Sequence, residues 1–499
     1  MKKNEQIRLT IQTIRFPCKG EGIYEGERVT VPYTLPGQEV LVQIGKKRKG
    51  QALGRALEVL TPAPWERKSP CPSFGICGGC IYQTAPPEEE LRLKEQMVRE
   101  LLANAGITDY IYDGAVNAPE LSGYRNKCEF SFGDTGIGGD LALGMRKRNS
   151  YYEVADLSAC NLIDGDYRQI VAATRDFFAE RKVPFYHSRQ HTGSLRHLVV
   201  RKGSATGELL LNLVTTSQME LPVEEWAKAL LALPLAGHIV GILHTVNDGV
   251  ADVALGSESR VLFGRDYLVE KLLGLSFRVT ATSFFQTNTS GAEVLYQTVR
   301  DYAGAESGRV IYDLYCGTGT IGQLLAQNAK KVYGVELWEA AVADANRNAE
   351  QNGITNAEFV AGDVLKMLDT LPEKPDLAVI DPPREGLVPK ALQKLAAMGI
   401  PRFVYVSCKP TSLARDLAAF REAGYHTERM KIVNQFPRTQ HVETVCLLSK
   451  LHEAKHHVNV RLDMDEMDLT AAESKATYEE IKKYVAEHND GMKVSNLYI

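Results

Sequence analysis

Residues 309–322 read RVIYDLYCGTGTIG, and this stretch decides the fold that the sequence predicts. An apolar strand ends at Asp313 and turns through Gly317 and Gly319 into the start of a helix. Glycines at such a turn let the backbone come close to a ligand, and the helix start offers unpaired N–H groups. The turn alone does not name the ligand, because dinucleotide sites show the same pattern.

The residues that follow this turn narrow the choice of ligand. Glu336 ends the next strand, KVYGVEL, 23 residues after Asp313, where an acidic side chain can accept both hydroxyls of a ribose. Asp363 ends the strand EFVAGD and can contact an adenine edge. Because the turn lacks the third glycine of a dinucleotide site and the lysine of a P-loop, an adenosine without a pyrophosphate fits better. The pattern favours S-adenosylmethionine, and an ordinary αβ sheet with polar strand ends is the alternative.

Apolar strands alternate with helical segments from about residue 281 onward. The strand segments are RVIYDLY, KVYGVEL, AEFVAGD, DLAVIDPP and RFVYVSC. Repeated βα units predict an α/β, Rossmann-like domain with a mostly parallel sheet, over residues 281–452. Open sheets of this kind bind ligands where the strands end, so Asp313, Glu336, Asp381 and Cys408 are expected on one rim.

The motif IDPPREGL bears on the substrate. In enzymes that methylate amines, the comparable motif commonly carries an aromatic residue after the two prolines, and here Arg384 takes that place. Cysteine-dependent RNA cytosine methyltransferases carry a Cys after the Pro of this motif, and this sequence has none. Neither an amine nor a cytosine is therefore the first expectation.

Cys408 ends the strand in RFVYVSCKPTSLARDL. A free cysteine is more often a small buried hydrophobe, but Lys409 and a helix start follow this one, and both can lower the pKa of a thiol. We therefore predict a reactive thiol. In the last strand, HVETVCLLSK, Glu443 is expected at the start and Cys446 in the core.

The chain before residue 281 divides into two further predicted domains. Residues 1–62 alternate apolar and polar side chains between Gly and Pro turns, which indicates a small OB-like β-barrel. Residues 63–280 mix strands and helices and indicate an α+β domain; its helix at 88–105 is expected to pack on the catalytic domain. Residues 453–499 form an acidic extension with one expected helix and no assigned chemistry.

The charge and composition of the chain limit the kinds of partner that it can bind. The 499 residues carry a net charge of −4 at a pI of about 6.3, which excludes a uniformly basic coat for nucleic acid. Residues 1–60 nevertheless hold eleven Lys and Arg against six Asp and Glu, and the runs 46–49 and 146–148 are candidate phosphate contacts or solvated turns. We expect a cytoplasmic protein without a membrane segment, because no signal peptide or sufficiently long apolar run is present.

The sequence also contains a group of closely spaced cysteines, in CPSFGICGGC. Cys71, Cys77 and Cys80 supply three of the four thiolates that an iron–sulfur cluster or a tetrahedral zinc ion would need. On the sequence alone, the fourth ligand is Cys18, Cys128 or Cys160.

Five motifs in one order resemble the RNA uracil-5-methyltransferases, over nearly the whole chain up to about residue 450. They are FFQTN (284–288), DLYCGTG, DPPREGL, SCKPTSLARDL and FPRTQHVETV. The likeness is greatest to the iron–sulfur enzymes that modify 23S ribosomal RNA. Residues 1–62 resemble the TRAM RNA-binding domain of many members, and Cys160 resembles the fourth ligand of a [4Fe-4S] cluster. Because the transfer RNA branch generally lacks the cysteine motif, the resemblance favours ribosomal RNA, with transfer RNA as the alternative.

The resemblance also implies a mechanism and a set of site residues. Cys408 would add to C6 of uracil so that C5 can attack the methyl group, and Glu443 would remove the C5 proton. Cofactor positions match Gln286, Tyr315, Glu336 and Asp381, although Asp381 is equally placed to bind the uracil. Thr320 and Asp363 are further cofactor candidates.

The RNA is expected to present a flipped uridine from a single-stranded loop to a monomeric enzyme. The rival reading is a non-catalytic iron–sulfur protein that binds RNA or senses redox state, which would need neither Cys408 nor Glu443.

Overall fold

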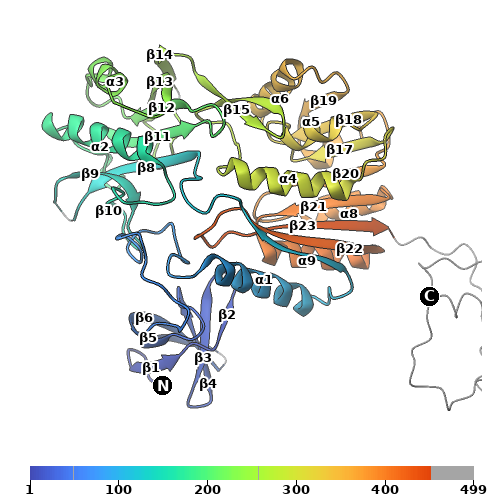
Figure 1. Ribbon diagram of the computed structural model, residues 1–499, viewed down its shortest axis with the longest axis horizontal. Coiled ribbons are helices and arrows are strands. Elements are labelled where there is room, and N and C mark those ends of the chain that lie inside the picture. Colours follow the sequence, from blue (N-terminus) through green and yellow to red (C-terminus); the bar gives the residue numbers. More distant parts are fainter. Residues whose placement is uncertain (49, 137, 257, 451–499) are drawn as a thin grey trace, which may run out of the picture. The chain divides into compact units, whose positions relative to one another are not determined.

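The computed structural model describes residues 1–48, 50–136, 138–256 and 258–450 (Figure 1). Lys49 of the first basic run and the expected C-terminal helix lie outside these ranges. A search of the described part of the chain finds no helix with the length and apolar character that crossing a membrane requires.

The N-terminal region is a six-stranded sheet with the order β1-β5-β6-β4-β3-β2. The strands are β1 (Gln6–Thr10), β2 (Thr13–Arg15), β3 (Lys19–Tyr24), β4 (Glu27–Pro32), β5 (Glu39–Arg48) and β6 (Gln51–Thr61). Buried and exposed side chains alternate along β1, so Ile7 and Leu9 enter a core with Val29 and Val40. This period of two explains why a short, half-buried strand forms here.

The central region is a seven-stranded sheet with the order β10-β9-β8-β11-β12-β13-β14. Its strands are β8 (Lys127–Asp134), β9 (Leu141–Arg146), β10 (Val154–Ala155), β11 (Leu195–Lys202), β12 (Glu208–Thr215), β13 (His238–Val246) and β14 (Glu258–Gly264). Helices α2 (Gly165–Glu180) and α3 (Val223–Leu231) pack on it and share its core.

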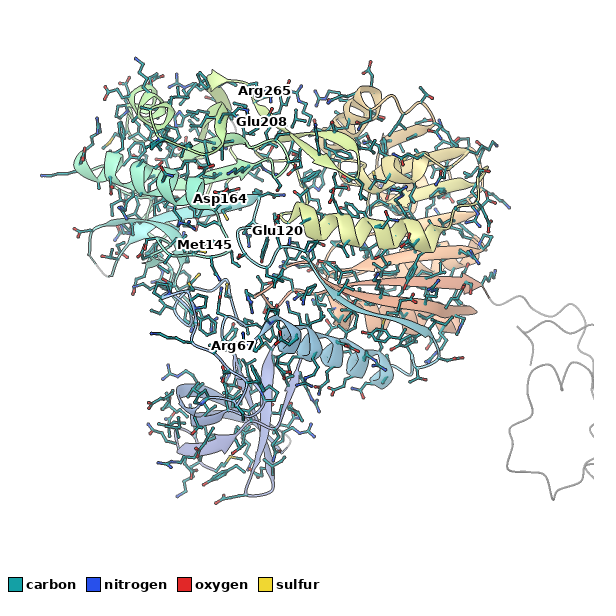
Figure 2. All side chains as sticks on the ribbon, in the orientation of Figure 1. Arg67, Glu120, Met145, Asp164, Glu208 and Arg265 are labelled. Carbon is teal, nitrogen blue, oxygen red and sulfur yellow. The ribbon has the colours of Figure 1, made fainter. Side chains whose placement is uncertain are left out.

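A two-stranded hairpin, β15 (Tyr267–Leu272) and β16 (Leu275–Thr280), leads from this sheet to the catalytic region. Glu208 on β12 and Arg265, just before the hairpin, form an ion pair of 2.5 Å (Figure 2). The same carboxylate accepts the N–H of Val269 at 2.6 Å, so it fastens the hairpin to the central sheet.

The C-terminal region is an eight-stranded sheet with the order β19-β18-β17-β20-β21-β23-β22-β7 (Figure 1). Its strands are β7 (Ile111–Asn117), β17 (Val310–Leu314), β18 (Lys331–Glu336), β19 (Ala357–Ala361), β20 (Leu377–Ile380), β21 (Arg402–Ser407), β22 (Tyr425–Asn434) and β23 (Glu443–Lys450). Strands β17 to β21 are parallel to their neighbours and β23 is antiparallel. The predicted α/β class is confirmed.

Helices cover both faces of this sheet. They are α4 (Thr289–Ala303), α5 (Thr320–Ala326), α6 (Glu339–Gln351), α7 (Val364–Met367), α8 (Pro389–Ala397) and α9 (Pro410–Glu422). Successive side chains of β17 point to opposite faces of the sheet, which explains why helices form a layer on each face. Val310, Tyr312 and Leu314 join a core with α8 and α9, whereas Ile311 joins a core with α4 and α5.

The segment that follows the cysteine cluster also belongs to this sheet. Helix α1 (Pro87–Asn104) packs on α9 and β22, and Val98 and Leu102 enter the core beneath β17. Strand β7 pairs in parallel with β22. Because β22 would otherwise be an edge strand, this early segment completes the catalytic sheet before the chain enters the central region.

Candidate functional site

The polar residues singled out by the sequence lie where the strands of the C-terminal sheet end. Glu336 is the last residue of β18, Asp381 and Cys408 directly follow β20 and β21, and Glu443 is the first residue of β23. Since β23 runs antiparallel to β21, its beginning lies beside the end of β21. The topology therefore brings these side chains to one rim.

The glycine turn after β17 is tightly constrained. Tyr315, Gly317 and Gly319 all have left-handed backbone, with φ of 65°, 55° and 71°. A Cβ on Gly319 would lie 2.7 Å from the ring of Phe359 and 2.9 Å from Cβ of Ala345, so only glycine fits there. Tyr315 bears a side chain in a conformation that is rare for residues other than glycine, which is the kind of strain that clusters at functional sites.

Glu336 holds this turn in place. One carboxylate oxygen accepts the N–H of Gly317 at 3.1 Å, and the other accepts the N–H of Trp338 at 3.1 Å. Burial raises the pKa of Tyr315 to about 12, and the charges of Asp363 and Glu336 add to that shift. Two predicted cofactor residues, Glu336 and Asp363, therefore lie within range of a third, Tyr315.

Asp363 and Thr320 occupy different surroundings within this group. Asp363 is exposed and caps α7, where its side chain accepts the N–H of Lys366 at 3.3 Å. Thr320 is buried at the first position of α5, and its hydroxyl lies 3.4 Å from the hydroxyl of Thr318. Of the two, only Asp363 is accessible to a ligand without rearrangement.

Asp313 is fully buried behind the turn. Its Oδ2 accepts the N–H of Gly322 at 2.7 Å, and its Oδ1 has no protein partner. Burial raises the pKa of Asp313 to about 7, with smaller contributions from the charges of Asp381 and Glu336. The carboxyl group thus fixes the start of α5 from within the core.

Three ionisable groups meet beside the glycine turn. Burial raises the pKa of Cys408 to about 11, and the charges of Glu443 and Asp381 raise it further. Burial, together with the charge of Asp381, raises the pKa of Glu443 to about 8. The pKa of Asp381 is raised by burial to about 7. Arg384, exposed on the following loop, opposes the shifts of Cys408 and Glu443.

This arrangement matches what a covalent nucleophile and a general base need. A thiol beside a carboxyl group whose pKa lies near neutrality can exchange protons with bound substrate at physiological pH. The thiol of Cys408 is only partly buried, so it remains reachable from the rim.

Gln286 approaches the same centre from the loop before α4. Its side-chain oxygen accepts the Nε2–H of Gln435 at 2.9 Å, and its backbone oxygen accepts the Nδ2–H of Asn126 at 2.9 Å. Gln286 also lies beside Tyr296, whose raised pKa it partly offsets; Tyr296 was not singled out in the sequence.

Tyr296 lies on α4 with 5% of its surface exposed. Burial raises its pKa, and the charges of Asp381, Asp313 and Glu443 contribute. Its phenol therefore belongs to the acidic centre. The one signal available in the sequence was a tyrosine on the apolar face of a helix, and that pattern is more typical of an ordinary core residue.

The four candidate metal ligands lie close to one another. Burial raises the pKa of Cys80 to about 12, and the charges of Cys160, Cys77 and Cys71 follow as further causes. All nine cysteines are free. The N–H of Gly79 donates to the sulfur of Cys77 at 3.4 Å, and Gln83 donates to the sulfur of Cys80 at 3.3 Å.

Four free thiols that influence one another are donors of the type that thiolate-ligated clusters use, and two of them, Cys77 and Cys80, receive N–H···S hydrogen bonds. Cys18 belongs to a different buried group with Tyr82 and Lys94. No set of three or more His, Cys, Asp and Glu side chains with the geometry to hold a metal ion occurs in the described ranges.

The second basic run is engaged within the protein. Arg146 pairs with Asp252 at 2.6 Å, and Lys147 pairs with Glu153 at 3.0 Å. Arg148 donates to the backbone oxygens of Cys77 and Cys80, at 3.1 and 2.5 Å, and stacks on the ring of Tyr33. These three cations therefore hold loops together, and the interpretation as phosphate contacts gains no support.

Comparison with known proteins shows which families this chain is similar to. A family model described as tRNA (Uracil-5-)-methyltransferase matches residues 205–374, and one described as a methyltransferase domain matches residues 305–458. An uncharacterized RNA methyltransferase of Clostridium tetani is 44% identical over 450 residues, covering 90% of this chain and 99% of the relative. One from Caldanaerobacter subterraneus subsp. tengcongensis is also 44% identical, covering 90% and 100%.

Among solved structures, the fold is similar to the Pyrococcus abyssi tRNA (uracil-54, C5)-methyltransferase in complex with S-adenosyl-L-homocysteine. The TM-score is 0.70 at 25% identity, over 89% of this chain and 100% of that chain. The likeness thus extends over most of the chain.

Proposed function

Since this chain belongs to the RNA uracil-5-methyltransferase family and is an RNA methyltransferase that uses S-adenosylmethionine, we propose that it methylates C5 of a uridine in ribosomal RNA through a covalent adduct on Cys408. The observation that carries the mechanism is the meeting of Cys408, Glu443 and Asp381 at the end of β21, next to the glycine turn. We propose that a nucleophile, a base and the bound cofactor share this rim.

The first step activates C5. The thiolate of Cys408 attacks C6, the electrons of the C5–C6 double bond move towards O4, and an enolate forms. The sulfonium methyl group then passes to C5 and S-adenosylhomocysteine leaves. Because burial disfavours the thiolate of Cys408, the positive charges of Arg384 and of the bound sulfonium should assist this step.

The second step releases the product. Glu443 takes the proton from C5, the electrons of that C–H bond restore the C5–C6 double bond, and the bond between C6 and sulfur breaks to return the thiolate. Burial and the nearby charge of Asp381 raise the pKa of Glu443 to about 8, so its carboxylate is a stronger base than an ordinary one. Glu443 then passes its proton to the thiolate, so the enzyme returns to its starting state, and the proton that the thiol lost at the start goes to solvent as the one proton that the overall methylation releases.

The cofactor is proposed to bind at the part of the rim beside the glycine turn. Glu336 would accept the ribose hydroxyls while it holds Gly317, and Asp363 would face the adenine edge near Tyr315. Gln286, Asp381 and Thr320 complete the proposed cofactor set. Asp381 raises the pKa of both Glu443, the proposed base, and Asp313, behind the glycine turn. It is therefore equally placed to bind the uracil ring.

We further propose that Cys71, Cys77, Cys80 and Cys160 hold a [4Fe-4S] cluster, with zinc as the alternative. The mutual influence of the four thiols, and the N–H···S hydrogen bonds to Cys77 and Cys80, support this ligand set. Such a cluster would supply rigidity to the loop that carries three of its ligands. The residues themselves position neighbouring segments, and no step of methyl transfer passes through the cluster.

Ribosomal RNA is the proposed substrate because the cysteine cluster is the feature that resembles the ribosomal branch. Transfer RNA is the second candidate, since the similar Pyrococcus abyssi enzyme acts on uracil 54 of tRNA. Mass mapping of ribosomal and transfer RNA from cells with and without this protein, grown with methyl-labelled methionine, distinguishes the two. We expect one or more uridines of ribosomal RNA to lose the label at C5. Loss confined to transfer RNA would refute the ribosomal assignment.

A non-catalytic RNA-binding or redox-sensing role makes a different prediction. In that case purified protein would bind RNA but transfer no methyl group from S-adenosylmethionine in vitro. The retention of Cys408 and Glu443 side by side supports the enzyme, because a silent site would need neither residue.

A further inference from the structure

The loop that precedes Glu443 is held by parts of the chain more than 300 residues away. We call residues 435–442, between β22 and β23, the base loop, because Glu443 follows it directly. The argument rests on the proposed role of Glu443 as the base that removes the C5 proton.

The segment that follows Cys80 contacts the base loop through its backbone. The N–H groups of Ile81 and Tyr82 both donate to the backbone oxygen of Arg438, at 2.7 and 3.1 Å. The hydroxyl of Tyr124 donates to the backbone oxygen of Pro437 at 2.8 Å. Two adjacent carbonyl groups of the base loop are thus anchored to residues outside the catalytic domain.

Helix α1 contacts the same residue through a buried carboxylate. Glu90, with 1% of its surface exposed, accepts the backbone N–H of Arg438 at 2.8 Å. The guanidinium group of Arg438 donates to the backbone oxygen of Ala85 at 2.6 Å and lies 3.5 Å from Glu90. Arg438 is therefore held by its N–H, its carbonyl and its side chain at once.

A buried lysine strengthens this junction. Lys94 has no exposed surface; it pairs with Glu90 at 2.9 Å and donates to Asn434 at 2.6 Å. Asn434 is the last residue of β22, and it also donates to Glu90 at 3.1 Å. Since buried ion pairs are costly to break, the start of the base loop and α1 move as one unit.

Within the base loop, two hydrogen bonds order the residues between Arg438 and Glu443. The hydroxyl of Thr439 donates to the backbone oxygen of Phe436 at 2.8 Å, and the N–H of His441 donates to that hydroxyl at 3.2 Å. Val442, next to Glu443, is 1% exposed. A displacement of Arg438 would consequently pass through Thr439 and His441 to the start of β23.

We propose that Arg438 is a positioning residue, which sets the carboxylate of Glu443 for removal of the C5 proton by tying the base loop to α1 and to residues 81–85, which follow Cys80. Arg438 has a φ of 71°, which is rare for a residue with a side chain, and three sets of contacts over-determine it. Such strain persists only where the surroundings enforce it. Arg438 acts on the second half of the reaction, after the methyl group has moved.

The test uses three variants of the full-length protein and measures the covalent RNA–protein adduct on denaturing gels with methyl-labelled cofactor. Arg438→Gly keeps the left-handed backbone and the carbonyl that Ile81 and Tyr82 use, but removes the guanidinium group. Arg438→Lys keeps a positive charge beside Glu90. Arg92→Ala, which removes an exposed arginine of α1 that pairs with Glu89, is the matched control.

We expect Arg438→Gly to lower turnover roughly 10- to 100-fold, since small misplacements of a catalytic group cost that much. The methyl-labelled adduct should accumulate most in Arg438→Gly, less in Arg438→Lys and least in wild type. The affinity for S-adenosylmethionine should be the same in all three proteins. Arg92→Ala should match wild type. If the glycine variant does not fold, the comparison of Arg438→Lys with wild type still decides the question.

Equal adduct levels in wild type and the Arg438 variants would overturn the proposal. So would a variant in which methyl transfer to the RNA and release of the methylated RNA from the protein are slowed to the same degree. Failure of the proposed function looks different, because the wild-type protein would then form neither methylated RNA nor an adduct.

Discussion

Ser407, the last residue of β21, is paired with Thr444 on the antiparallel strand β23. The next position outward on each strand is Cys408 and Glu443, so the two side chains face the same side of the sheet at the rim. The influence of Glu443 on the pKa of Cys408 follows from this register. A slip of one residue would point the thiol and the carboxyl group to opposite faces.

Substitution of each partner should stop the reaction at a different stage. Cys408→Ala should lose methylation while keeping RNA affinity, because the nucleophile does not position the RNA. Glu443→Gln should still transfer a methyl group but slow product release by about 10²–10⁴-fold, the usual contribution of a general base. A denaturing gel with labelled cofactor checks this: adduct in Glu443→Gln and none in Cys408→Ala. Adduct in neither variant would contradict the assignment of the base.

The rate should depend steeply on pH below neutrality. Glu443, with a pKa raised to about 8, and Cys408, with a pKa raised to about 11, are both protonated at low pH, and both must be ionised to act. We expect kcat/KM to rise about a hundredfold per pH unit below about pH 8, where both groups ionise, and about tenfold per unit from there to about pH 11, where only the thiol still ionises, since kcat/KM reports the free enzyme. A flat profile between pH 6 and 8 would show that neither group limits the reaction.

The thiol itself should respond to its neighbour. Burial is the main reason why the pKa of Cys408 is raised, and the charge of Glu443 is the next. Glu443→Gln removes that charge and should lower the pKa of the thiol, so that alkylation by iodoacetamide becomes faster above about pH 8, where Glu443 of the wild type is ionised. Mass spectrometry of the Cys408 peptide separates it from the other eight cysteines. The Glu358→Gln variant, on exposed β19, should leave the alkylation rate unchanged.

The buried base should also make stability depend on pH. The pKa of Glu443 is raised from an ordinary 4.5 to about 8, so its contribution to stability is fully present below about pH 4.5 and is lost as the pH rises through about 8. Glu443→Gln cannot ionise and should melt above wild type at pH 9. The gain should be a few degrees, since 1 kcal/mol shifts Tm by about 2–4 °C at this domain size. Scanning calorimetry at pH 5 and pH 9 measures the difference, which should grow with pH.

Metal analysis can decide between the three candidate fourth ligands. Cys160→Ala should lose most of the iron and acid-labile sulfide of anaerobically purified protein, because Cys160 lies within range of the charges of Cys71, Cys77 and Cys80. Cys128→Ala and Cys18→Ala are controls that remove buried thiols and should keep the metal. Zinc in place of iron would establish the alternative centre. Loss of iron in Cys128→Ala but not in Cys160→Ala would contradict the ligand set.

The local chemistry of the chain can be predicted from single segments of the sequence. The turn in RVIYDLYCGTGTIG has glycine at 317 and 319, where left-handed φ values of 55° and 71° favour it, and the alternation of βα units predicts the parallel sheet. These features follow from neighbouring residues, because turn conformations and strand periods are local properties. The order of the motifs was sufficient to identify the family for the same reason.

Which distant segments meet depends on how the folded chain packs. The sequence leads us to expect the helix at 88–105 against the catalytic domain, but no local pattern places β7 in its sheet, and none links Arg438 to Glu90 and Ile81. Tyr296 reads as a core residue, and its place beside Asp381 depends on how α4 packs on the sheet. Strand register and helix packing join residues hundreds of positions apart, and a single sequence records neither of them.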